Sequence, residues 1–75
     1  MTYRYYLLGD TIPVRVAFNE TGLKIGAEIP SRDKQTLIQD ATYLSRLEHS
    51  FEVDEITEDQ FAARCRTIYE RHSVK

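Results

Sequence analysis

The sequence predicts an α+β fold in which an antiparallel meander of three to four strands carries two α-helices on one face. Residues 12–18 and 23–29 contain apolar and polar side chains in period-two alternation, which is typical of half-buried strands. Residues 41–50 and 57–72 instead repeat apolar side chains at helical spacing. A sheet with one apolar face supplies the surface that two amphipathic helices need. No linker or repeat divides residues 1–75, so we expect a single compact domain in the order strand, strand, strand, optional strand, helix, helix.

A β-hairpin is expected between residues 11 and 29. Apolar residues occupy alternate positions in both of its halves, and the connection between the halves reads "NETG". Gly22, the last residue of that connection, can take the positive φ that a hairpin loop of this length needs. The residues expected on the core face are Ile12, Val14, Val16 and Phe18 in the first half and Leu23, Ile25, Ala27 and Ile29 in the second.

Two further stretches extend the predicted sheet. "TYRYYLL" is rich in β-forming residues and stops at a Gly-Asp turn signal, which predicts a first strand over residues 2–8. "TLIQ", residues 36–39, fits either a short fourth strand or the first turn of a helix. We favour the strand because Asp40, directly after it, is a good N-cap for a helix over residues 41–50. Three apolar residues share one face of that helix: Leu44, Leu47 and Phe51.

The second helix is expected to begin at a capping box. Thr57 and Gln60 are three residues apart, so each side chain can bond the free backbone N–H of the other. Ile56 and Phe61 flank this start with the spacing of a hydrophobic staple. The two acids that follow Thr57 lie in the first turn, where the helix dipole favours negative charge. The apolar stripe of the helix contains Phe61, Cys65, Ile68 and His72, broadened by Ala62 and Tyr69.

Charge is distributed unevenly along the chain. Ten Lys and Arg stand against twelve Asp and Glu, for a net charge of −2. Residues 48–59 contain acids but no Lys or Arg, whereas residues 60–75 are basic overall. Helix capping accounts for Glu58 and Asp59. We expect the chain just ahead of Thr57 to be an exposed loop, and the remaining acids there and at its rim are candidates for binding a basic surface of a partner: Glu48, Glu52, Asp54 and Glu55.

The sequence contains no motif for catalysis, metal binding or cofactor binding. Neither phosphate-binding glycine pattern occurs, and the serines lack a recognisable His and Asp arrangement. Glu48, His49 and Glu52 share a helical spacing, but a metal site needs three or four converging ligands. Cys65 lies on an apolar helix stripe, which favours core packing over a reactive thiol. We therefore expect a non-enzymatic protein with no metal and no cofactor.

The first functional hypothesis is a small protein-binding module. Its acidic patch would pair with Lys or Arg residues that a larger partner uses for its own ligand, and would thereby block that partner. Compact acidic domains of this kind are common among immunity-type proteins and among inhibitors encoded by phages or other mobile elements, which is an analogy at the level of class. The single cysteine and the lack of a signal-like or membrane-spanning apolar run predict a cytoplasmic protein.

Two alternative functions use the outward face of the sheet, on the premise that Tyr3, Tyr5 and Leu7 point inward. In the first, cations interleaved with an aromatic ring hold a single-stranded nucleic acid. The residues of that nucleic-acid face are Arg4, Tyr6, Arg15 and Lys24. In the second, the protein is a homodimeric structural subunit whose interface protects the outward Tyr6 and Leu8.

Overall fold

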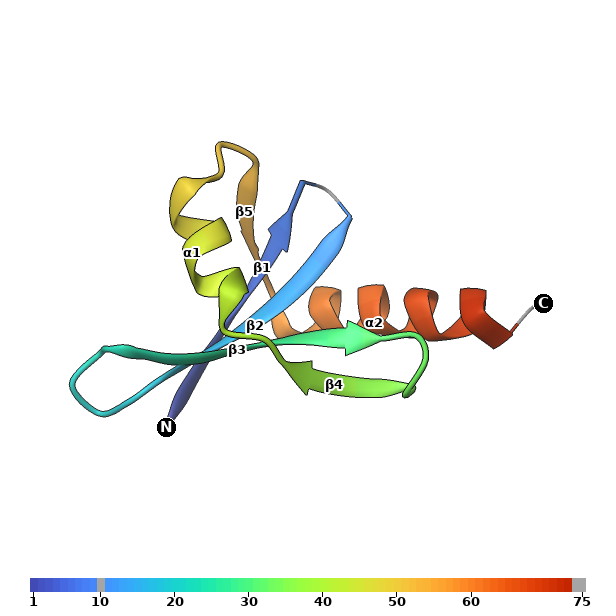
Figure 1. Ribbon diagram of the computed structural model, residues 1–75, viewed down its shortest axis with the longest axis horizontal. Helices are drawn as coiled ribbons and strands as arrows, with labels where there is room; N and C mark the ends of the chain where they lie inside the picture. The colour runs from blue at the N-terminus through green and yellow to red at the C-terminus, as the bar shows by residue number, and fades with distance from the viewer. Residues whose placement is uncertain (10, 74–75) are drawn as a thin grey trace.

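The computed structural model contains one antiparallel sheet of five strands and two helices (Figure 1). It describes residues 1–9 and 11–73, with side chains as far as residue 70. The strands are β1 (Thr2–Leu8), β2 (Ile12–Phe18), β3 (Lys24–Ser31), β4 (Thr36–Gln39) and β5 (Val53–Ile56), and the helices are α1 (Thr42–His49) and α2 (Glu58–Ser73). Their order across the sheet is β4-β3-β2-β1-β5. The predicted α+β class with an antiparallel sheet is confirmed.

Strands β1 to β4 form the expected meander, in which each strand pairs with the next one in the chain. The "TLIQ" segment is strand β4, as predicted. Gly22 has a φ of 87°, so the β2–β3 turn uses the positive φ that the sequence indicates. Asn19 stabilises this turn, because its side-chain oxygen accepts hydrogen bonds from the backbone N–H of Thr21 (3.0 Å) and Leu23 (2.9 Å).

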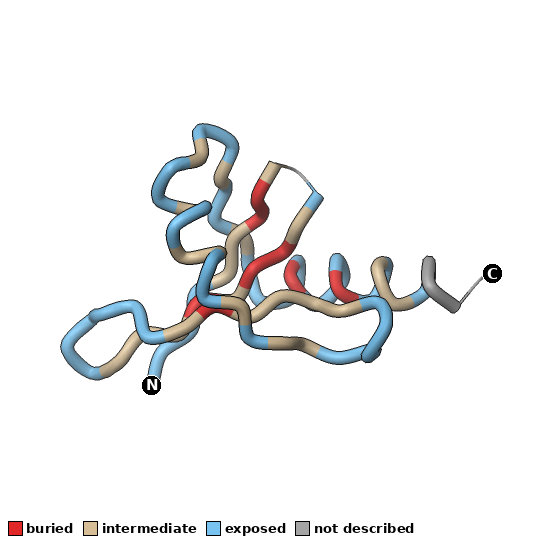
Figure 2. The backbone as a smooth tube through the Cα atoms, viewed as in Figure 1, coloured by how far each residue is buried: buried red, intermediate tan, exposed pale blue. Residues whose placement is uncertain are grey.

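The sheet lies between the two helices. On the side of α1, called the α1 face, the core residues are Leu8, Val14, Val16 and Ala27, with Tyr43, Leu44 and Leu47 of α1 packed against them. On the other side, the α2 face, Tyr5 stacks against Phe61 of α2 with ring centroids 5.0 Å apart. Figure 2 shows buried segments in the central strands and in α2. The structure differs here from the expected single covered face, because Leu7 and Pro13 make the second face of the sheet apolar as well.

Strand β5 lies where the sequence pattern predicts an exposed loop ahead of Thr57, and that prediction is corrected. Val53–Ile56 pair antiparallel with β1, with Leu8 opposite Val53 and Tyr5 opposite Ile56. Without β5, β1 would be an open sheet edge with unpaired backbone N–H and C=O groups. The segment "VDEI" has one apolar residue on each face, so it lacks the alternation by which strands are recognised.

Three apolar residues expected in the core lie on the surface. A β-bulge between Ala17 and Phe18 interrupts the alternation of β3, and Ile25 is 50% exposed. Leu23 precedes the strand and is 64% exposed. Helix α1 ends at His49, so Phe51 lies beyond the helix and is fully exposed.

The starts of the two helices differ in how they are fixed. At α2 the predicted capping box is confirmed: Thr57 N donates to Gln60 Oε1 (2.9 Å), and Gln60 N donates to Thr57 Oγ1 (3.1 Å). Helix α1 begins at Thr42, one residue later than predicted, and the carboxylate of Asp40 accepts a hydrogen bond from Thr42 N (3.1 Å). Within the described range of the chain, neither helix combines the length and apolar character needed to cross a membrane.

Candidate functional site

Strand β5 divides the acids of the predicted patch between the two faces of the sheet. Successive strand residues point to opposite faces, so Asp54 lies on the α2 face and Glu55 on the α1 face. Glu52 precedes Asp54 by two residues. The backbone oxygen of Glu52 accepts a hydrogen bond from Gly9 N (2.7 Å), which continues the β1–β5 pairing. Glu48 lies near the end of α1. The four acids therefore form two separate pairs instead of one patch.

The two acids on the α1 side are paired with cations of the same chain. Arg4 Nη1 lies 3.9 Å from Glu55 Oε2, and Lys24 Nζ lies 3.7 Å from Glu48 Oε1. All four side chains are at least 39% exposed, so water screens both pairs and each contributes little to stability. The pairing nevertheless neutralises the local charge, which makes Glu48 and Glu55 poor candidates for recognising an external cation.

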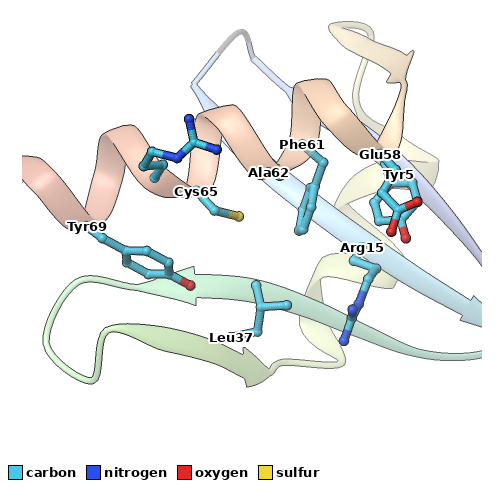
Figure 3. Close-up of a pocket in the computed structure, with 9 residues that line it drawn as sticks. Tyr5, Arg15, Leu37, Glu58, Phe61, Ala62, Cys65 and Tyr69 are labelled. Carbon is cyan, nitrogen blue, oxygen red and sulfur yellow. The ribbon is translucent and has the colours of Figure 1, made fainter.

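The acids on the α2 side form a separate row, called the acidic strip, which consists of Glu52, Asp54, Glu58 and Asp59. All four are exposed, and none forms an ion pair with another residue that the structure describes. Glu58 lies beside Tyr5 (Figure 3). Burial, followed by the negative charge of Glu58, raises the pKa of Tyr5. The strip therefore presents exposed carboxylates that form no ion pair with the described cations.

A fully exposed aromatic ring, Phe51, stands at the start of the acidic strip. It lies in the connection between α1 and β5, where Ser50 Oγ accepts a hydrogen bond from Glu52 N (3.3 Å). Large aromatic side chains are normally removed from water in a folded domain. An exposed aromatic residue beside unpaired charges is typical of a protein-interaction surface.

The residues of the predicted nucleic-acid face are distributed over both sides of the sheet. Arg4 and Tyr6 lie on the α1 face, whereas Arg15 lies on the α2 face. Arg15 Nη2 lies 2.6 Å from Glu28 Oε1, and its guanidinium lies 4.6 Å from the centre of a tyrosine ring. Lys24 is already paired with an acid of α1. These four residues therefore do not form the continuous basic surface that a nucleic-acid backbone needs.

The residues predicted to form a homodimer interface, Tyr6 and Leu8, are not on the surface of the sheet. Tyr6 and Leu8 do not face outward but pack into the core under α1. The exposed apolar side chains of the sheet lie on the opposite face, where Tyr3 and Ile25 border a shallow hollow of about 210 Å³ together with Met1. The premise that Tyr3 points into the main core is therefore corrected.

A groove of about 440 Å³ lies between α2 and the outer part of the sheet (Figure 3). Leu37 of β4 points toward the side of α2 that carries Phe61, Cys65 and Tyr69. Cys65 is buried, as its place on the apolar stripe predicts. Burial raises the pKa of its thiol, against a smaller opposing effect of the positive Arg15. The groove, called the edge groove below, is completed by Tyr5, Arg15, Glu58, Ala62 and Arg66.

The acids and histidine near the end of α1 do not converge on a common point. His49 Nδ1 lies 2.9 Å from the backbone oxygen of Ser45, within its own helix. Among the residues with described positions, no three His, Cys, Asp or Glu side chains are grouped so that they could hold a metal ion. The chemistry offered by this part of the surface is that of charge, hydrogen bonding and apolar contact.

Two features of the site are absent from the sequence prediction. The sequence prediction explains Glu58 and Asp59 by helix capping alone. Their closeness in sequence to Asp54 could have indicated that these acids contribute to the same surface. The edge groove has no sequence signal, because it requires Leu37 and α2 to meet across the sheet.

Comparisons with protein-family models, with curated proteins and with solved structures found no match for this chain.

Proposed function

We propose that this protein is a small non-enzymatic binding module that docks on a basic surface of a larger protein through the acidic strip and Phe51. The observation that carries the proposal is the division of acids at β5. Arg4 and Lys24 pair with the acids on the α1 side, and the acids of the strip form no ion pair with a cation in the described part of the chain. Exposed carboxylates without a counter-charge raise the local negative potential and speed encounter with a positive surface.

The strand geometry supports this choice of surface. The β1–β5 pairing fixes the backbone of Glu52 and Asp54, so the spacing between these two residues is set before a partner arrives. Preorganisation lowers the entropy lost on binding. Phe51, which is fully exposed and directly precedes Glu52 in the chain, supplies the aromatic anchor that hot spots of protein interfaces commonly contain.

An inhibitory role follows from the same chemistry. A partner whose Lys and Arg residues bind a phosphate or nucleic-acid ligand would lose those cations to the acidic strip and be blocked. We include in the proposal an inhibitor or immunity-type role, encoded by a phage or mobile element and acting in the cytoplasm. The lone thiol of Cys65 is compatible with that reducing compartment.

The test compares two adjacent acids on opposite faces. Asp54→Lys lies in the acidic strip, whereas Glu55→Lys lies on the α1 face, and both change the net charge equally. Binding to an immobilised lysine-rich peptide with one leucine is measured by surface plasmon resonance at low and high salt. We expect Asp54→Lys and Phe51→Ala to weaken binding by about tenfold and Glu55→Lys by less than about threefold.

Salt and folding controls make the result interpretable. Binding of the unmodified protein should weaken as salt rises, because the contacts are exposed charges. Circular dichroism and melting temperature establish that each variant is folded. Equal losses in Asp54→Lys and Glu55→Lys would show that only net charge matters, and the proposal would then be wrong.

A further inference from the structure

The free edge of β4 is a second surface, separate from the acidic strip. β4 is the outer strand on its side of the sheet, so the backbone N–H and C=O groups along its free edge have no strand partner. None of the residues Thr36–Gln39 is charged, whereas β5 at the other edge contains Asp54 and Glu55. Proteins commonly protect an open edge with charged residues, and β4 lacks that protection.

The edge groove reaches this strand through one residue, Leu37, and otherwise lies over β1 and β2. Helix α2 packs on β1, β2 and β3, and the groove of about 440 Å³ lies between α2 and Leu37 of β4 (Figure 3). Phe61 and Cys65 are buried in the helix wall of the groove, and Tyr69 is half-buried. A volume of this size, with a mainly apolar lining and a polar rim, is sufficient for one or two apolar side chains.

A strained residue holds β4 beside α2. Gln35, directly before β4, has a φ of 57°, which is uncommon for a residue other than glycine. Its side-chain Nε2 donates to the backbone oxygen of Arg32 (2.8 Å) and lies 3.4 Å from the backbone oxygen of Tyr69 in α2. Strained positions persist where the surrounding structure holds them, and they are frequent at ligand-binding sites.

The charges around the β4 edge are opposite in sign to those of the acidic strip. Arg32 and Lys34 lie in the turn that leads into β4, and Arg66 lines the groove. None of these three cations forms an ion pair with a residue in the described part of the chain. The acids nearby are Asp33, in the same turn, and Glu58, which lines the groove together with Arg66. A ligand with a negative group near the start of β4 would therefore be attracted.

We propose that the β4 edge binds an extended peptide segment of a partner protein as an added strand. Alternate apolar side chains of the peptide enter the edge groove beneath α2, and an acidic residue at its flank faces Arg32, Lys34 or Arg66. In this mode of recognition, main-chain hydrogen bonds supply affinity and side-chain pockets supply specificity. Glu58 belongs to both the acidic strip and the groove lining, but the β4 edge is on the opposite edge of the sheet from β5, so this inference does not rest on the proposed function.

The test selects ligands from a display library of short random peptides against the full chain. We expect enriched peptides to have apolar residues at alternate positions and an acidic residue at one flank. Ala62→Trp places a large side chain in the groove, whereas Ala63→Trp is a matched control because Ala63 is exposed on the same helix and does not line the groove. An enriched peptide should bind Ala62→Trp about tenfold or more weakly and Ala63→Trp within about threefold.

Hydrogen exchange on the complex gives the readout specific to strand addition. Binding of an enriched peptide should slow exchange at backbone amides of Thr36–Gln39, because outward N–H groups acquire hydrogen-bond partners. Failure to enrich any peptide, equal binding by the two tryptophan variants, or protection confined to other strands would overturn the inference. A concentration-dependent doubling of the free protein's mass that Ala62→Trp abolishes would identify a second copy as the occupant, and would also overturn it.

Discussion

The two edges of the sheet have opposite chemistry although both are short antiparallel strands. The β5 edge carries Asp54 and Glu55 and continues into further acids of α2, whereas β4 is uncharged and has cations beside it. An acidic edge resists pairing with another strand, and an uncharged edge permits it. The comparison indicates that the β5 edge is suited to binding by side-chain charge and the β4 edge to binding by backbone.

Helix α2 connects these two regions. It begins directly after β5 with a capping box at Thr57, and its later turns form the wall of the edge groove beside Leu37. Figure 1 shows it starting at the end of β5 and running in roughly the direction of β3. The position of this one helix therefore determines the geometry of both candidate surfaces, and the largest predicted effects concern it.

Phe61→Ala is expected to cause the largest loss of stability, because it loosens the helix that shapes both candidate surfaces. Phe61 is 5% exposed and stacks against Tyr5, so it anchors α2 on the sheet. Its removal should lower the free energy of unfolding by about 3 kcal/mol, through lost burial and the cavity left behind. Urea unfolding measures this loss, with Ala63→Gly as the control for a change at an exposed helix position, expected to cost about 1 kcal/mol. A loss in Phe61→Ala no larger than in the control would contradict the anchoring role.

Thr57→Ala and Asp40→Ala compare the helix starts that follow the two edge strands. The hydroxyl of Thr57 accepts the capping bond from Gln60 N, and its removal should cost about 1 kcal/mol of folding free energy. Asp40 accepts a bond from Thr42 N ahead of α1, and its replacement should cost about 0.5 kcal/mol. The same urea experiment ranks the two variants. A larger loss in Asp40→Ala would reverse the conclusion that the β5 junction is the better fixed of the two.

Alkaline pH is expected to weaken packing at the edge groove. Burial raises the pKa of the Cys65 thiol from 9.0 and that of Tyr69 from 10.0. The folded protein then holds these protons more tightly than the unfolded chain does. Their contribution to stability is complete below pH 9 and is lost as the pH rises through the raised pKa values.

The melting temperature should therefore fall as the pH is raised above 9, and it should fall less steeply in Cys65→Ala. The slope is the relevant quantity, because the variant also loses apolar packing at every pH. Identical slopes in the two proteins would contradict the assigned role of burial at Cys65.

Glu48→Gln and Glu55→Gln are expected to have the smallest effects on stability. Each removes one partner of an exposed ion pair on the α1 side, Lys24–Glu48 or Arg4–Glu55. The free energy of unfolding should change by less than about 0.5 kcal/mol in each case. A decrease of more than about 1 kcal/mol in the free energy of unfolding would show that these ion pairs stabilise the fold. Glu48 and Glu55 would then have a structural role that is not assigned to the acids of the strip.

The parts of the fold that follow from local sequence are the parts that could be predicted. The capping box depends on Thr57 and Gln60, which are near neighbours, and the β2–β3 hairpin depends on alternation and on Gly22. Strand β5 could not be recognised in the same way. Its residues gain strand structure from the open edge of β1, which is distant in the chain.

The candidate site shows the same limit more sharply. The excess of acid before Thr57 is visible in the composition, but adjacent Asp54 and Glu55 are indistinguishable until β5 orients them to opposite faces. The cations that compensate Glu48 and Glu55 come from β3 and β1, and sequence alone does not reveal these partners. The edge groove depends on the meeting of β4 and α2, which is likewise a tertiary property.

An NMR titration of the labelled protein with a lysine-rich peptide tests most directly whether the division of acids at β5 creates the docking surface. We expect the changes in backbone amide chemical shift to concentrate at Phe51, Glu52, Asp54, Glu58 and Asp59 and to be small at Glu48 and Glu55. Shifts spread equally over both groups of acids, or centred on Glu48 and Glu55, would contradict it.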